Sequence, residues 1–230
     1  MDERPPYIGY HFAEFVMMGL ALITLLGLII KNNKNSKVEY RYIFSCYLVG
    51  TLIQECITLL YEYVSFITEF ADIDKISANV FTLFEFILFS YFFLLVIKIP
   101  LAKKIIQINL CGFSAFCILY WLIPNNITKF PYQISTVECF LMIAYCLIYF
   151  FELFNNFSQQ TLIPKPPSFW IVTGMLVYFI CIIPMFLILG IVPDGISHYY
   201  DDLHYINFLS CSIFYISMIK AFLWKTMRTA

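Results

Sequence analysis

The sequence has few charged residues and no excess of positive charge. Asp, Glu, Lys and Arg make up only 13% of the chain, and the formal net charge is −1. Proteins that bind nucleic acid carry a basic patch, often interleaved with aromatic side chains, and none of the hydrophilic connections contains one. We therefore expect no direct nucleic-acid binding.

The sequence also lacks the motifs of common metal and redox sites. Its eight cysteines include no Cys-x-x-Cys pair, which excludes a zinc ribbon or a dithiol site. A zinc site could use His11, His198, Asp201 and His204, because imidazole and carboxylate bind zinc. The Ser-x-x-x-His and His-x-x-x-His motifs of seven-helix hydrolases of the ceramidase and progestin-receptor type are missing. We expect no enzyme and no cofactor, with a zinc-dependent intramembrane hydrolase as the alternative.

The sequence also lacks long hydrophilic segments. The longest connections between apolar stretches run to about 15 residues, which is too short to fold alone. Seven long apolar stretches occupy most of the chain. They cover residues 12–30, 42–66, 79–97, 105–123, 133–153, 169–190 and 204–224. A helix needs roughly 20 mostly apolar residues to cross a bilayer. The sequence predicts an all-α polytopic membrane protein, with 1–230 forming a single seven-helix transmembrane domain.

Successive connections between membrane helices lie on alternate sides of the membrane, and the basic residues divide unevenly between the two sides. Eleven would lie on one side, namely Lys31, Lys34, Lys37, Arg41, Lys98, Lys103, Lys104, Lys165, Lys220, Lys225 and Arg228. Only Arg4, Lys75 and Lys129 would lie on the other. Basic loops stay in the cytoplasm, so we expect the N-terminus outside and the C-terminus in the cytoplasm, in the inner membrane of a bacterial cell.

Several glutamates interrupt the apolar stretches. They are Glu14, Glu55, Glu62, Glu85 and Glu138, with Glu152 near the end of the fifth stretch. A charged, unpaired side chain at the centre of a membrane helix costs about 2.5–3.5 kcal/mol on insertion scales. With a rise of about 1.5 Å per residue, the expected orientation places the first five in the outer half of the membrane.

Helical spacing puts these residues on polar stripes. The stripes comprise Thr51, Glu55, Thr58 and Glu62; Asn79, Thr82 and Glu85; and Glu138, Met142, Tyr145, Tyr149 and Glu152. His11 with Glu14, and His204 with Asn207 and Ser210, recur every three residues at the same outer level. We expect one outward-opening pocket for a ligand or ion. Its members would be Glu14, Glu55, Glu62, Glu85, Glu138, His11, His204 and Asn207.

The pocket has few cations to neutralise it, since the only basic residue deep in a stretch is Lys220, at the opposite end. We expect several of the carboxyls to be protonated and hydrogen-bonded. Three roles remain open: joining helices, handling protons or cations, and recognising a cationic or polyol ligand. Pro184 lies inside the sixth stretch and predicts a kink, either a tolerated proline or a functional hinge.

Part of the sequence resembles a known group of proteins. Phe169-Trp170-Ile171 with Gly174 and Tyr178, followed by Ile206-Asn207 and Ala221-Phe222, is similar to small seven-helix membrane proteins of Bacteroidetes-type bacteria. Those proteins accompany sensor histidine kinases and other signalling genes. The resemblance implies a sensory or accessory role for this chain.

Together these observations predict an integral inner-membrane sensor or accessory protein that signals to a partner. The expected partners are the lipid bilayer, a cytoplasmic or membrane protein, and further copies of the chain. One alternative is an oligomeric pore or membrane-perturbing accessory of an antiphage or CRISPR-type defence system. A second alternative is a proton- or cation-coupled transporter.

Overall fold

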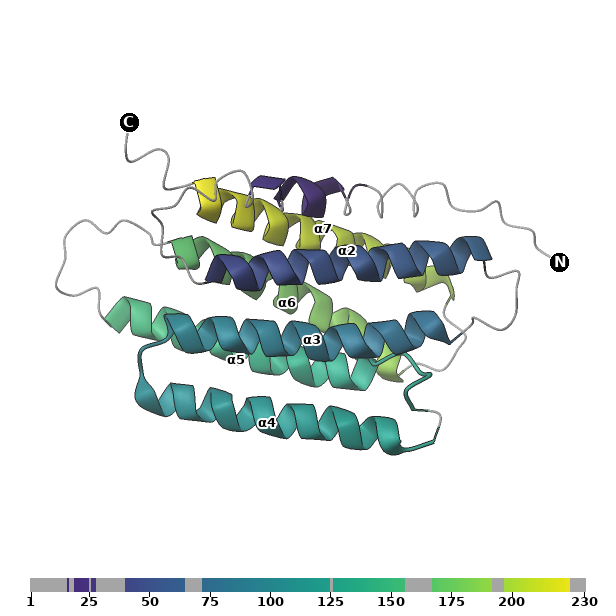
Figure 1. The fold of residues 1–230 in the computed structure, drawn as a ribbon, viewed down its shortest axis with the longest axis horizontal. Helices are drawn as coiled ribbons and strands as arrows, with labels where there is room; N and C mark the ends of the chain where they lie inside the picture. Colours follow the sequence, from purple (N-terminus) through teal and green to yellow (C-terminus); the bar gives the residue numbers. More distant parts are fainter. Residues whose placement is uncertain are drawn as a thin grey trace.

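The protein is all-helical in a computed structural model that describes residues 16, 19–24, 26–27, 40–64, 72–124, 126–155, 167–191 and 197–223. For residues 61–64, 197–204 and 223 only the backbone is described. The long helices are α2 (Tyr40–Val64), α3 (Ile73–Val96), α4 (Pro100–Leu122), α5 (Tyr132–Asn155), α6 (Pro167–Ile191) and α7 (Ser197–Leu223) (Figure 1).

All six long helices are of a length and composition that can cross a membrane. The candidate spans are Tyr40–Leu60, Ile73–Val96, Pro100–Leu122, Tyr132–Asn155, Pro167–Ile191 and Tyr205–Phe222. The fold is therefore that of a multi-pass membrane protein. The predicted first helix, 12–30, falls largely outside the described residues, and those of its residues that are described are helical.

The helices are antiparallel neighbours along the chain. The most extensive contacts join α6 to α7, α5 to α6 and α2 to α3, whereas α4 packs on α3 and only briefly on α5. In Figure 1 α4 accordingly lies at one edge of the bundle. Because α3 and α5 are separated by one antiparallel helix, they run in the same direction and contact each other directly.

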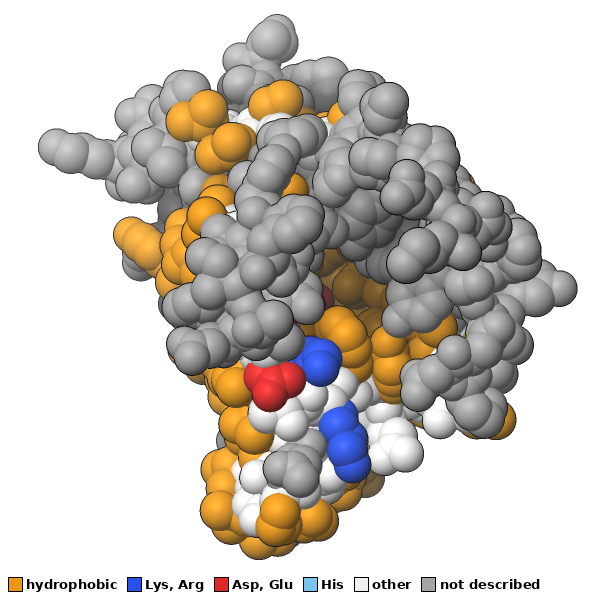
Figure 2. All heavy atoms as spheres, turned by 90° about the vertical axis from the view of Figure 1, so that its right-hand side faces the viewer, with side chains coloured by type: hydrophobic (Ala, Val, Ile, Leu, Met, Phe, Trp, Pro, Cys, Tyr) orange, Lys and Arg blue, Asp and Glu red, His pale blue; other side chains and the backbone are white. Residues whose placement is uncertain are grey.

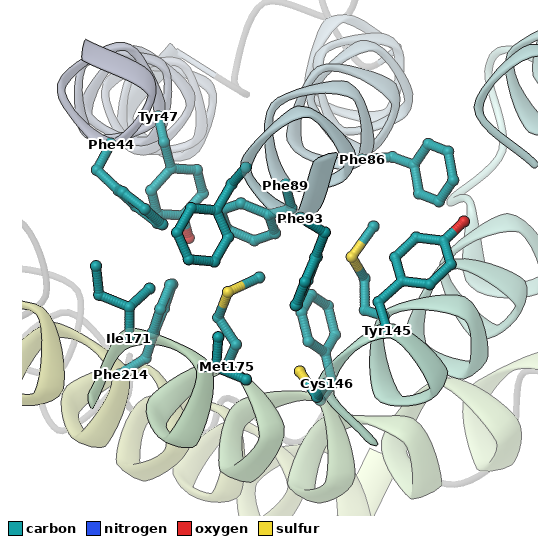
Figure 3. Packing of buried hydrophobic residues seen from close by; sticks show 14 of the residues in the cluster. Phe44, Tyr47, Phe86, Phe89, Phe93, Tyr145, Cys146, Ile171, Met175 and Phe214 are labelled. Atoms are coloured by element: carbon teal, nitrogen blue, oxygen red, sulfur yellow. The ribbon is translucent and has the colours of Figure 1, made fainter. Parts of the chain in front are cut away.

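Aromatic side chains fill the space between α2 and α3 on one side and α6 and α7 on the other (Figure 3). Phe89 of α3 is fully buried at the centre of this group. Its ring centroid lies 4.8 Å from that of Tyr47, 5.9 Å from that of Phe214 and 6.1 Å from that of Phe179. Tilted and edge-on aromatic pairs of this kind are favourable, so the polar side chains of the bundle sit in strongly apolar surroundings.

Gly174 allows α6 and α7 to approach closely. A Cβ atom at this position would lie 2.6 Å from the Cβ of Ser217, which is closer than side-chain carbons pack. Small residues serve this purpose in membrane helix pairs, where backbone proximity supplies much of the association energy. The pair with the most extensive contact in the bundle therefore depends on the missing side chain of Gly174.

Three helices begin earlier than the sequence predicted. The third was expected from residue 79 and begins at Ile73, the fourth from 105 and begins at Pro100, and the last from 204 and begins at Ser197. Their first turns contain polar residues, which lower hydropathy without preventing backbone hydrogen bonds. Pro100 also suits the first position of a helix, where no amide hydrogen is needed.

Asn79 fixes the connection between α4 and α5 against α3. Its amide nitrogen donates to the carbonyl oxygens of Ile127 (3.1 Å), Lys129 (2.8 Å) and Lys75 (2.9 Å). Its side-chain oxygen accepts a hydrogen bond from the indole of Trp121 at 3.1 Å. These contacts place Asn79 level with the start of α5, so the first turns of α3 project beyond that level.

Candidate functional site

Two buried carboxyl groups are neighbours where α3 packs on α5. Glu85 of α3 is 6% exposed and Glu138 of α5 is 3% exposed. The carboxyl of Glu85 is the charged neighbour that acts on Glu138. In each side chain the Oε1 atom is buried without a hydrogen-bond partner. We call Glu85 and Glu138 the carboxyl pair.

The carboxyls of Glu85 and Glu138 lie at the same depth in the bundle, because Asn79 of α3 is level with the start of α5. Asn79 is level with the start of α5, and Glu85 follows Asn79 by six residues. Glu138 likewise follows Tyr132, the first residue of α5, by six residues. At a rise of about 1.5 Å per residue, both carboxyls lie about 9 Å below that level. They are nearer to this end of the bundle than to the other.

Phenols and thiols surround the carboxyl pair. The Tyr47 hydroxyl of α2 is the hydrogen-bonding neighbour of Glu85. The remaining titratable neighbours of the pair are Cys117 of α4, Cys139 of α5, Tyr178 of α6, and Cys211 and Tyr215 of α7. Among the described residues, no Lys, Arg or His side chain lies beside either carboxyl. The pair is therefore not neutralised by an ion pair there.

Glu55, on the predicted polar stripe of α2, shares neighbours with Glu85. It is half-buried, and it neighbours Cys211 and Tyr215 on α7, both of which also face Glu85. Asn207 joins from α7, since its side-chain oxygen accepts a hydrogen bond from Cys211 at 3.4 Å. Of the residues expected in the pocket, Glu85 and Glu138 are thus neighbours, and Glu55 and Asn207 are linked to Glu85 indirectly, through Cys211.

Other predicted pocket residues cannot be placed in the same way. His11 and Glu14 lie outside the described residues, and so do the side chains of Glu62 and His204, although both backbones are helical. Pro184 is exposed on α6, which runs without interruption from Pro167 to Ile191. Its role as a hinge remains a prediction.

Two further acidic residues on buried helix faces have structural partners. Asp74 accepts a hydrogen bond from Thr58 at 2.9 Å and so joins α3 to α2. Glu152, 9% exposed, accepts hydrogen bonds from the backbone amides of Lys98 at 2.8 Å and Ile99 at 3.4 Å. A carboxylate is favourable at this position because the N-terminus of α4, at Pro100, carries partial positive charge.

Sequence reasoning missed the residues that surround the carboxyl pair. Tyr47 precedes Thr51 and Glu55 at intervals of four, and Cys211 and Tyr215 continue the same interval from Asn207. This spacing is the signal that could have extended both stripes. Tyr178 and Cys139 have no comparable signal, because their approach to Glu85 depends on how α5 and α6 are rotated in the bundle.

The end of the bundle nearer to the carboxyl pair is hollowed. Figure 2 shows this end with hydrophobic side chains inside the recess and charged side chains at its described margin. Within the described part of the chain, no group of three His, Cys, Asp or Glu residues could hold a metal ion. The described titratable groups at the pair are carboxyls, phenols and thiols.

Comparisons of the chain with protein-family models, with curated proteins and with solved structures find no match.

Proposed function

We propose that this protein is a multi-pass inner-membrane sensor or accessory protein. Its acidic centre, formed by Glu55, Glu85 and Glu138, would respond to a small ligand, a proton or the state of the membrane. The response would pass to a cytoplasmic partner protein. The observation that carries the proposal is the carboxyl pair, with two buried oxygens that have no hydrogen-bond partner.

The unpartnered oxygens favour a functional role over simple helix joining. Polar groups that join membrane helices do so by hydrogen bonding across the interface. A buried acceptor without a donor instead costs about 1–3 kcal/mol, and more if it is charged. Thr58 with Asp74 shows the joining role in this same bundle, with a 2.9 Å hydrogen bond. The carboxyl pair lacks such bonds at both Oε1 atoms.

The residues around the carboxyl pair could transmit a change at the pair to the other helices. Its neighbours come from α2, α4, α6 and α7 as well as from α3 and α5. A change of charge at the pair would therefore alter contacts among all six long helices. At the far end of the bundle, the Lys220 ammonium lies 3.5 Å from the ring centroid of Trp170 and joins α7 to α6.

The topology that we propose has seven spans, with the N-terminus outside and the C-terminus in the cytoplasm. The six apolar helices support an alternating path across the membrane. Lys98, Lys103 and Lys104 then lie at the cytoplasmic end and Lys75 and Lys129 at the outer end. In this topology the hollowed end, and with it the carboxyl pair, opens to the outside.

Proton- or cation-coupled transport is the second candidate, and the buried face of α5 favours it. Glu138, Tyr145, Tyr149 and Glu152 are all buried along this face and extend over most of the helix. Tyr149 is hydrogen-bonded to Ser168 of α6 at 2.9 Å. Polar groups thus follow α5 from the carboxyl pair toward the opposite end.

The experiment that tests the sensor proposal uses the full-length protein in lipid nanodiscs. Intrinsic fluorescence of its tryptophans, which include Trp121 on α4 and Trp170 on α6, is followed while pH and salt cations are varied. We expect the native protein and Asp72→Asn, an exposed control carboxylate, to respond, and Glu138→Gln to lose the response. An unchanged response in Glu138→Gln would contradict the proposal.

A second measurement separates sensing from transport. The same proteins are reconstituted into liposomes that contain a pH-sensitive dye, and a pH gradient is applied. A sensor leaves the dye signal equal to that of empty liposomes. Dissipation of the gradient by the native protein, and not by Glu138→Gln, would establish transport instead.

A further inference from the structure

We infer that the carboxyl pair binds a single proton, shared between Glu85 and Glu138 and exchanged with water at the end where α3 and α5 begin. This inference rests on the proposed function, because it names the ligand that the acidic centre would sense.

Burial and the unpartnered oxygens favour a hydrogen shared by the two side chains. Each carboxyl has one buried oxygen without a partner, and Glu85 is the acidic neighbour of Glu138. Two carboxylates side by side in an apolar interior repel each other, so one of them keeps its proton. A protonated carboxyl is a donor and an ionised one is an acceptor. One proton therefore supplies a donor that the two unpartnered Oε1 atoms otherwise lack.

The other titratable groups that face the pair do not remove the need for this proton. They are Tyr47 of α2, Cys117 of α4, Cys139 of α5, Tyr178 of α6, and Cys211 and Tyr215 of α7. Phenols and thiols are neutral at neutral pH in water, so they supply no positive charge.

The same neighbours explain why the ligand is a proton and not a metal cation. Calcium binds six to eight oxygen ligands, and magnesium needs octahedral oxygen coordination. Three of the groups around the pair are thiols, Cys117, Cys139 and Cys211, which such hard cations avoid. Among the described residues there is no group of acids, histidines and cysteines arranged to hold a metal. A proton needs only the two carboxyl oxygens.

Access to the pair is shortest from the hollowed end. Both carboxyls lie about 9 Å below the level at which α5 begins, and the recess at that end is visible in Figure 2. The proton is taken from water and returned to water, with only an O–H bond made or broken. No oxidant, reductant or second substrate takes part.

Infrared spectroscopy of the full-length protein in nanodiscs tests the inference directly. The carbonyl stretch of a protonated carboxyl is separate from the bands of a carboxylate. We expect the native protein at neutral pH to show a protonated-carboxyl band that shifts in D₂O and disappears in Glu85→Gln/Glu138→Gln. Asp72→Asn, which removes an exposed carboxylate, should leave the band unchanged. Equal spectra for the native protein and the double variant would overturn the inference.

A substitution that keeps the acid tests the inference even if the double glutamine variant does not fold. Glu138→Asp retains a carboxyl on a shorter side chain, so we expect it to move the protonated-carboxyl band without removing it. If the double glutamine variant does not fold, this shift assigns the band to the pair. A native spectrum without any protonated-carboxyl band at neutral pH would overturn the inference without reference to a variant.

The infrared test of the shared proton and the fluorescence test of the proposed function can give different results. A protonated band assigned to the pair, with no fluorescence response to pH, would support the shared proton and contradict the sensor. A fluorescence response to a cation, with no protonated band, would support the sensor and contradict the proton as its ligand.

Discussion

Asn79 takes part in four hydrogen bonds, which makes it a testable single residue at the end of the bundle where α5 begins. Asn79→Leu keeps the volume but leaves the Trp121 indole and the carbonyl oxygens of Ile127 and Lys129 without this partner. We expect the free energy of unfolding to fall by about 1–3 kcal/mol. Unfolding in mixed detergent micelles measures the loss, with Ser77→Ala, which removes one local hydrogen bond, as the control. A loss no larger than the control's would contradict the interpretation.

Glu152 offers a second residue-level test. Glu152→Ala removes the acceptor of the Lys98 and Ile99 amides next to the N-terminus of α4. Losing such an interaction costs about 1–2 kcal/mol, and Glu152→Gln should lose less because it keeps one oxygen acceptor. Thermal unfolding of both variants measures the difference. Equal stability of the alanine variant and the native protein would show that the amides find other partners.

The sequence predicts which faces of single helices are buried, but not which residues meet across them. Glu138 and Glu85 were expected inside from their spacing, and both are buried. Asn79 was expected on the same polar stripe as Glu85, and it holds the connection before α5. Helical spacing is a property of one helix and can be read along the chain. The neighbours of a side chain depend on the rotation and offset of two helices, which no short stretch of sequence records.

At the scale of the helix, hydropathy locates the middle of each element better than its ends. The fifth stretch was expected over 133–153, and α5 spans Tyr132–Asn155. By contrast α7 begins seven residues before the expected 204, at Ser197. Residues 197–204 read Ser-His-Tyr-Tyr-Asp-Asp-Leu-His, which is polar and therefore excluded by a membrane criterion. A helix can continue beyond the apolar layer of the membrane, whereas hydropathy locates only the part of the helix within that layer.

Close packing of α6 on α7 gives a prediction with a matched control. Gly174→Ala places a Cβ atom where Ser217 already lies, whereas Gly112→Ala on α4 places one in open space. We expect Gly174→Ala to lower the unfolding temperature and Gly112→Ala to leave it unchanged or raised, because alanine favours helix over glycine. Ser217→Gly should restore part of the loss. Equal effects of the two alanine variants would contradict the close approach.

Pro184 tests whether α6 carries the response. Proline removes the amide hydrogen that would bond the carbonyl four residues earlier, so Pro184→Ala restores a backbone donor. Its side chain is exposed, and we therefore expect stability to be kept or increased. The expected functional result is a smaller fluorescence response to pH in nanodiscs. A full response in a stable Pro184→Ala protein would exclude the hinge.

For the whole molecule, topology is the prediction that decides which compartment the carboxyl pair faces. Single cysteines at Asn126, before α5, and at Lys98, before α4, are introduced into a variant with the native cysteines replaced. With the expected orientation, a membrane-impermeant thiol reagent applied to intact cells labels the first and not the second. Labelling of the second alone would reverse the orientation, and the pair would then face the cytoplasm.

The projection of α3 beyond the start of α5 has a consequence for the lipids around the protein. If the apolar layer ends near Tyr132, the tip of α3, with Lys75 ion-paired to Asp72 at 3.3 Å, lies among the lipid headgroups. The carboxyl pair is then only about 9 Å from that layer. Anionic headgroups at a surface potential of about −30 mV concentrate protons roughly threefold beside them. The lipid composition of the facing leaflet would then set the bulk pH at which the pair releases its proton.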